Sequence, residues 1–216
     1  MIQFRKKVSL FLFVISLSSI VYSDVVKPAL VEISVYADRQ VSIEIRTSLE
    51  ALLTGINGQF RNTVEAPNAY EYDRLRSMTS SDLLDEFEAF HSTLLSRVRL
   101  TLDGKAIPLT ITDVKAAPTG YTKVPRVSVI TLNGLLETDA LHLQWYYPQS
   151  FGDQIVRVRQ VNEAEQKYHW SSHQWIKEDR LTNPFLLTEV FAKPSFASVA
   201  KTYVKSGFLH IIPRGV

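Results

Sequence analysis

Two neighbouring stretches of alternating apolar and polar residues restrict the fold of this chain most strongly. In PALVEISVYADRQVSIEIRTS, residues 28–48, an apolar side chain recurs at every second position on both sides of Asp38-Arg39-Gln40. Side chains of a β-strand point alternately to its two faces, so this period indicates two strands with one buried face each. The polar residues between them predict a β-hairpin. The apolar positions are Val31, Ile33, Val35, Val41, Ile43 and Ile45.

Short strands are also predicted further along the chain. RVRLTLDGKAIPLTI, residues 97–111, has the pattern of a hairpin around Asp103-Gly104. Many short strands with turn signals between them are typical of an antiparallel β-sandwich, so we expect a mainly β domain over residues 24–192. The other strand candidates are residues 126–132, 140–146, 154–161 and about 167–175.

One or two helices are expected as insertions in the sandwich. Thr47 and Glu50 have the spacing of a capping box, which predicts a short helix that ends near Gly55. Thr79 is placed to cap a second helix over residues 79–98, which carries one apolar stripe.

The first 23 residues have the pattern of a secretory signal peptide. Arg5, Lys6 and Lys7 precede an apolar run of about 14 residues, which is short for a membrane span of roughly 20. We expect cleavage before Asp24, with an uncleaved anchor as the alternative. Cleavage removes three of the 24 basic residues and leaves 21 against 22 acidic ones, a net charge of −1. Nucleic acid is therefore not an expected partner.

Residues 193–216 have a different pattern. Apolar residues recur there at helical spacing, and no acidic residue follows Glu189. A basic amphipathic helix with aromatic residues on its apolar face is typical of a membrane surface, while packing on the sandwich is the alternative. The expected membrane-facing residues are Phe196, Tyr203, Phe208, Ile211, Lys201 and Lys205.

Metal ligands can be sought only among histidines and carboxylates, because the chain has no cysteine. His169 and His173 are four residues apart in YHWSSHQW. On a helix they would share a face, but the aromatic neighbours indicate a strand, where this spacing spans roughly 13 Å. The alternatives are a metal site closed by a turn at Ser171-Ser172 and an aromatic hairpin with surface histidines. His91 is expected at a helix boundary and His142 on a polar strand face.

No local catalytic motif is present. The chain lacks a G-x-S-x-G elbow, a phosphate loop and a dinucleotide fingerprint, so no enzymatic role and no cofactor are expected. A hydrolase site assembled in space from distant serine, histidine and aspartate residues is a lesser alternative. One aromatic-rich segment is either a binding surface or a set of ordinary strand residues. Its members are Trp145, Tyr146, Tyr147 and Phe151, flanked by Arg157 and Arg159.

Three segments resemble the exported N-terminal domain of HupE/UreJ-like membrane proteins. They are SIEIRTSLEALLTGI, YDRLRSMTSSDLLDEFEAF and YVKSGFLHIIPRGV. The resemblance implies that residues 203–216 are a junction into a transmembrane bundle. In the family this junction continues with Asp-His and apolar helices. The resemblance also implies a link to nickel uptake. It also implies that His210 belongs to a set of metal-handling residues. We expect either the domain portion of a longer protein or a stand-alone copy.

The leading hypothesis is therefore a non-enzymatic accessory domain on the periplasmic side of the inner membrane. Its expected partner is the membrane or a transmembrane bundle, and a second protein is a further alternative. The alternative is a soluble periplasmic module that binds a metal or another ligand through His169, His173 and His210.

Overall fold

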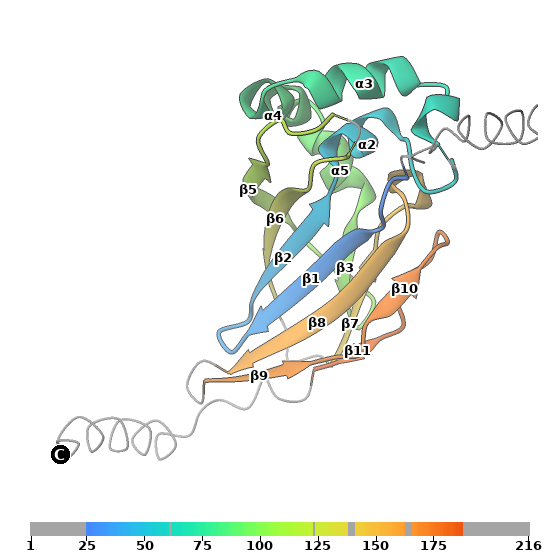
Figure 1. Ribbon diagram of the computed structural model, residues 1–216. Helices are drawn as coiled ribbons and strands as arrows, with labels where there is room; N and C mark the ends of the chain where they lie inside the picture. The colour runs from blue at the N-terminus through green and yellow to red at the C-terminus, as the bar shows by residue number, and fades with distance from the viewer. Residues whose placement is uncertain (1–24, 61, 123, 138–140, 163–165, 188–216) are drawn as a thin grey trace, which may run out of the picture.

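The computed structural model describes residues 25–60, 62–122, 124–137, 141–162 and 166–187 (Figure 1). The predicted signal peptide and the predicted amphipathic helix lie outside these ranges. The same is true of His210 and of all six predicted membrane-facing residues.

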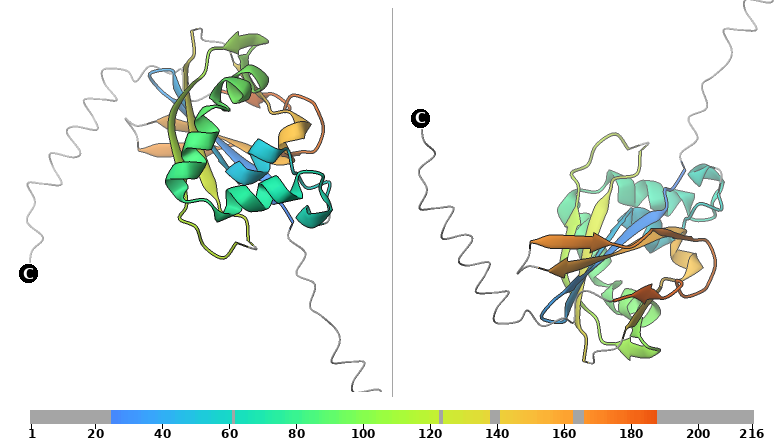
Figure 2. Two further views of the ribbon diagram at one scale, coloured as in Figure 1. Left: turned by 90° about the horizontal axis from the view of Figure 1, so that it is seen from above. Right: turned by 90° about the horizontal axis from the view of Figure 1, so that it is seen from below.

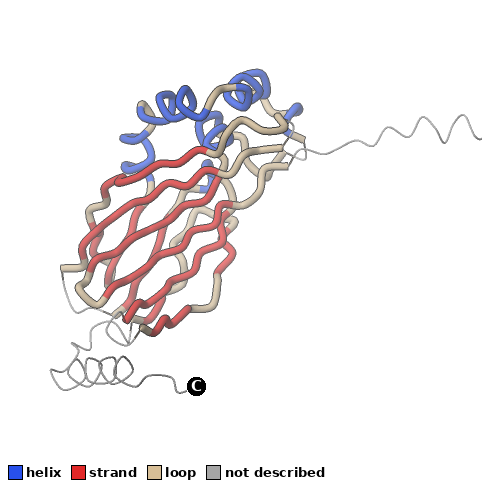
Figure 3. Tube along the Cα trace, turned by 60° about the vertical axis from the view of Figure 1, so that its left-hand side comes forward, coloured by secondary structure: helices blue, strands red, loops and turns tan. Residues whose placement is uncertain are grey.

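The described chain forms two β-sheets that face each other, so the predicted mainly β sandwich is confirmed (Figures 1 and 3). The large sheet has the strand order β10-β8-β1-β2-β6-β5, and β9 also pairs with β8. It consists of β1 (Ala29–Tyr36), β2 (Gln40–Thr47), β5 (Thr110–Ala116), β6 (Ser128–Leu135), β8 (Gln154–Asn162), β9 (Lys167–Trp170) and β10 (Gln174–Ile176). The small sheet has the order β11-β7-β3-β4 and consists of β3 (Arg99–Leu102), β4 (Lys105–Ile107), β7 (His142–Tyr146) and β11 (Phe185–Leu186).

The expectation of a wholly antiparallel sandwich is wrong at one place. β1 and β8 run parallel, with Val31 opposite Val156 and Tyr36 opposite Val161. A parallel pair needs a long crossover connection. Here the chain between β1 and β8 first builds the helices, most of the small sheet and the other half of the large sheet.

The core lies between the sheets and follows the alternation seen in the sequence. Val31, Ile33 and Ile43 are fully buried on the inner face of the large sheet. Trp145 of the small sheet is also fully buried, and its indole Nε1 donates a hydrogen bond to Gln154 Oε1 at 2.9 Å. This bond satisfies two buried polar groups and joins the two sheets.

The helices gather at one end of the sandwich, which we call the helical end (Figures 1 and 2). The predicted helix after β2 is confirmed, but its cap is Ser48 rather than Thr47, because Thr47 is the last residue of β2. The predicted helix over residues 79–98 is two helices that break after Glu88, and α3 was not predicted. The helical elements are α2 (Leu49–Thr54), η1 (Thr63–Glu65), α3 (Ala69–Ser77), α4 (Ser80–Glu88), α5 (His91–Arg97) and η2 (Gln149–Phe151).

The chain enters and leaves the described fold at opposite ends. Val26 belongs to a small apolar cluster with Ala51 and Tyr72 at the helical end. Leu187 follows β11, and its N–H donates to Leu141 O next to the start of β7, at the end away from the helices. No helix in the described ranges combines the length and the apolar character that a bilayer crossing needs.

Candidate functional site

The aromatic-rich segment between residues 145 and 151 does not form the binding surface that was one of its two predicted readings. Trp145 and Tyr147 are buried in the core, because alternate residues of this segment point inward. Phe151 packs against Phe90 and Tyr147, with ring centres 5.7 Å and 5.4 Å apart. Tyr146 points outward and contacts Arg99. Packing in the core and against neighbouring side chains therefore accounts for these four aromatic residues.

The two predicted arginines lie on a different surface, the outer face of β8. β9 runs antiparallel to β8 and places Trp170 opposite Arg159 and Tyr168 opposite Val161. Directly opposed residues share a face of the sheet. The Arg157 guanidinium lies 4.2 Å from the centre of the Trp170 ring, and that of Arg159 lies 5.5 Å from the rings of both Trp170 and Tyr168.

We call this surface the arginine–aromatic face. It consists of Tyr36, Arg157, Arg159, Tyr168, Trp170 and Trp175. Trp175 lies on the same side because it is opposite Ile155, and Lys177 Nζ lies 4.5 Å from its ring centre. Tyr168, Trp170 and Trp175 are 63%, 41% and 53% exposed. Figures 1 and 3 show no helix over this side of the large sheet within the described part of the chain.

Arg157 has a carboxylate partner on the neighbouring strand. Its Nε donates to Glu32 Oε1 at 2.7 Å, and its Nη2 contacts the same oxygen. Arg46 of β2 reaches the other carboxylate oxygen of Glu32 at 3.3 Å. Glu32 therefore lies between two cations, and the charge of Arg157 is already balanced.

Arg159 is held by a neutral group. Its Nε and Nη2 donate to Ser34 Oγ at 3.2 Å and 2.9 Å. Among the described residues, no carboxylate pairs with this guanidinium. Its positive charge is therefore available to a ligand.

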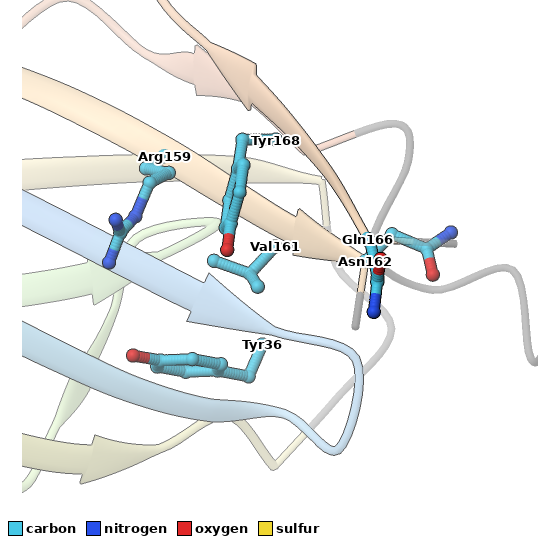
Figure 4. Close-up of a pocket in the computed structure, with 6 residues that line it drawn as sticks. All are labelled: Tyr36, Arg159, Val161, Asn162, Gln166 and Tyr168. Atoms are coloured by element: carbon cyan, nitrogen blue, oxygen red, sulfur yellow. The ribbon is translucent and has the colours of Figure 1, made fainter. Parts of the chain in front are cut away.

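A hollow of about 250 Å³ lies beside Arg159 at the end of the sandwich away from the helices. Figure 4 shows Tyr36 and Tyr168 on either side of Val161, with Asn162 and Gln166 where the strands end. The hollow thus combines two aromatic rings, one aliphatic floor, two amides and one cation. These groups can bind a small polar ligand with an apolar face.

A local irregularity gives the arginine–aromatic face its shape. β9 and β10 both pair with β8 and not with each other, so the predicted aromatic hairpin is wrong. Between them, Ser171 N donates to Val158 O at 2.9 Å, and Ser171 Oγ accepts from Val158 N at 2.9 Å. The Ser171 hydroxyl thus takes the place of a backbone carbonyl as the acceptor for Val158 N–H. Residues 167–176 therefore run along β8 as one strand that is interrupted between β9 and β10.

The predicted histidine ligands His169 and His173 lie in different parts of the fold. His169 is in β9, opposite Gln160, while His173 is in the connection before β10. The described residues contain no group of three His, Asp or Glu side chains placed to hold a metal ion. His91 packs edge-on against Phe87 at 5.0 Å, as a boundary residue would.

His142 is exposed and contacts the carboxylate of Asp103. His142 Nδ1 lies 3.1 Å from Asp103 Oδ1, and the backbone N–H of His142 donates to the same oxygen at 2.9 Å. This backbone bond, with a second from Leu141, lowers the pKa of Asp103 below its ordinary value. The contact fastens the β3–β4 turn to β7.

The sequence pattern groups Arg157 and Arg159 with the aromatic residues 145–151, but in the structure the two arginines contact Trp170 and Tyr168 instead. The available signal was the alternation of Tyr168 and Trp170, which has the same period as that of the two arginines. Only the register of β9 against β8 shows that these four side chains meet.

Comparison of the chain with protein-family models gives no match. Comparison with curated proteins also gives none. The resemblance to HupE/UreJ-like proteins therefore remains a prediction.

Proposed function

We propose that this chain is an exported accessory domain that associates with the outer surface of the inner membrane and binds a ligand or partner without catalysing a reaction. The arginine–aromatic face is its binding surface. In keeping with the HupE/UreJ resemblance, the domain serves a transmembrane bundle, and nickel uptake is the process to which it contributes.

The observation that carries the binding role is the exposure of three large aromatic side chains, each stacked with a cation, on an outer sheet face. Exposed aromatic residues gathered on one surface mark interaction sites more often than isolated ones do. Aromatic and arginine side chains are also the residues enriched in interfaces.

The path of the chain supports the membrane association. The described fold ends at Leu187 on the side away from the helices, where the basic amphipathic segment follows in sequence. If that segment lies at the bilayer, the helical end points away from it, and the hollow beside Arg159 lies on the membrane-proximal side. The six residues predicted to face the membrane belong to this segment.

Flotation with liposomes tests the association. The exported chain, residues 24–216, should rise with liposomes that contain anionic lipid. The variant that lacks residues 194–216 should stay at the bottom of the gradient. A variant with Lys201 and Lys205 changed to Glu should float less, because a basic helix is attracted to anionic lipid. Equal flotation of the full chain and the deletion variant would contradict the proposal.

The second candidate is a periplasmic module that binds a metal through His169, His173 and His210. The placement of His169 and His173 on either side of the Ser171 irregularity is the feature that favours it. Calorimetry with nickel and zinc tests this role. Retained binding after both histidines are changed to alanine would remove the site.

A further inference from the structure

We propose that the hollow beside Arg159 binds a sugar that carries a carboxylate. This inference rests on the binding role proposed above for the arginine–aromatic face and names the class of ligand for that face. Its support comes from the size of the hollow, the state of the Arg159 guanidinium and the kinds of side chain that line the rest of the site.

The volume of the hollow suits a ligand with about one ring. The hollow measures about 250 Å³. Pockets for drug-sized ligands and organic cofactors usually measure roughly 300–1,000 Å³. A single six-membered sugar ring is the scale of ligand that suits this hollow.

The guanidinium of Arg159 supplies the recognition of an anion. Arginine has five N–H donors, and here only Nε and Nη2 contact Ser34. Within the part of the chain that the structure describes, Nη1 of Arg159 has no hydrogen-bond acceptor. The free edge formed by Nη1 and Nη2 matches the two oxygens of a carboxylate. Ser34 fixes the plane of the guanidinium before the ligand arrives.

The other lining residues suit a sugar ring better than a phosphate. The rings of Tyr36 and Tyr168, beside the buried Val161, present apolar surface on which the C–H face of a sugar can pack. Asn162 and Gln166 carry amides that both donate and accept, as sugar hydroxyls do. Phosphate sites usually converge several donors or cations on the anion. Among the described residues, a single arginine lines the hollow.

Titration of the exported full chain, followed by NMR chemical shifts and by tryptophan fluorescence, tests the inference. The probes are methyl glucuronide, methyl glucoside, acetate and glycerol 3-phosphate. Methyl glucuronide should bind most tightly, and each of the other three should bind about tenfold more weakly or worse. Methyl glucoside lacks the carboxylate, acetate lacks the ring, and glycerol 3-phosphate lacks both. Shifted amide signals should include those of Tyr168 and Arg159.

Variants assign the binding to this hollow. Arg159→Met and Tyr168→Ala should each weaken methyl glucuronide binding by about tenfold or more. Arg99→Met is the matched control for the arginine, because Arg99 stacks on Tyr146 at 4.8 Å on the other sheet. Tyr70→Ala is the control for the tyrosine, since Tyr70 is exposed on α3. Circular dichroism checks that every variant is folded.

Several results would overturn the inference. Equal binding of methyl glucoside and methyl glucuronide would show that Arg159 does not recognise the carboxylate. Equal binding of acetate and methyl glucuronide would show that the site does not recognise the sugar ring. Tighter binding of glycerol 3-phosphate would instead identify a lipid headgroup site. A folded protein that binds none of the probes also overturns it. None of these outcomes alters the flotation result, so a failure here is distinct from a failure of the membrane association.

Discussion

Glu50 and Arg126 form an ion pair inside the molecule, although 76 positions separate them in the chain. The side chain of Glu50 is 0% exposed and that of Arg126 is 7% exposed. Ser48 Oγ donates to the second carboxylate oxygen of Glu50 at 2.8 Å, and Arg126 Nη2 donates to Leu75 O at 2.8 Å. The pair thus ties α2, the end of α3 and the segment before β6 together.

Removal of one partner of this pair should destabilise the protein strongly. Glu50→Gln leaves the Arg126 charge buried without its carboxylate, and such changes cost about 3–5 kcal/mol. Urea unfolding measures the free energy of unfolding. Glu71→Gln, which removes the exposed partner of Arg74, is the matched control and should have little effect. Similar losses in the two variants would show that the buried pair has no special role.

A methyl group at Gly134 should disturb the packing of β6 against the β4–β5 connection. A Cβ atom there would lie 3.0 Å from Leu109 Cδ2 and 3.1 Å from Pro108 O. Gly134→Ala should therefore lower the free energy of unfolding by about 1–3 kcal/mol, the usual cost of overpacking. Gly120→Ala is the control, because a Cβ atom at that position would have no neighbouring atom within 4 Å. The midpoint temperature of thermal unfolding is measured for both variants. An unchanged midpoint for Gly134→Ala would refute the expected clash.

Ser171→Ala should loosen the connection between β9 and β10. The change removes the oxygen that accepts the Val158 N–H at 2.9 Å, and a lost hydrogen bond of this kind costs about 1 kcal/mol. Hydrogen exchange at the Val158 amide should become faster, and ligand binding at the arginine–aromatic face should weaken. Ser172→Ala serves as the neighbouring control. Unchanged exchange at Val158 would mean that the hydroxyl does not hold the ladder.

The acid sensitivity of the protein should depend in part on Asp103. Its backbone hydrogen bonds from His142 and Leu141 lower the pKa of this carboxyl in the folded state. The contact therefore contributes stability above the unfolded pKa of about 3.9, and this contribution is lost as the pH falls through the lowered folded value.

Asp103→Asn should be less stable than the natural chain at pH 7, and the difference should shrink below about pH 4. Urea unfolding between pH 7 and pH 3 measures this change. Asp85→Asn, on the exposed side of α4, is the control and should follow the natural chain at every pH. A constant difference between Asp103→Asn and the natural chain across the range would contradict the assignment.

The local patterns in the sequence predicted most elements of the fold. The alternation around Val31 and Ile43 identified β1 and β2, and Thr79 capped α4 as expected, with its side chain accepting from Asp82 N at 3.2 Å. The failures were a helix boundary, the missed helix α3, the aromatic hairpin and the parallel pairing of β1 with β8. The apolar stripe over residues 79–98 predicts one continuous helix, whereas the structure has a break after Glu88. An apolar stripe indicates which residues face the core, but not where a helix ends.

The candidate site was less predictable than the fold. The sequence pattern groups Arg157 and Arg159 with Trp145 and Tyr147, as one binding surface or as ordinary strand residues. In the structure Trp145 and Tyr147 are buried in the core. Neighbours in sequence on a strand point to opposite faces, so proximity in the chain was a poor guide to a shared surface.

The sequence by itself determined the period of each strand, and with it which side chains of that strand are buried, because alternation is a local property of an extended backbone. Tertiary structure alone decided which strands are neighbours. The parallel pairing of β1 with β8 and the register of β9 bring Tyr36, Arg159 and Tyr168 to one hollow. Such pairings depend on packing between distant segments, and no local pattern encodes them.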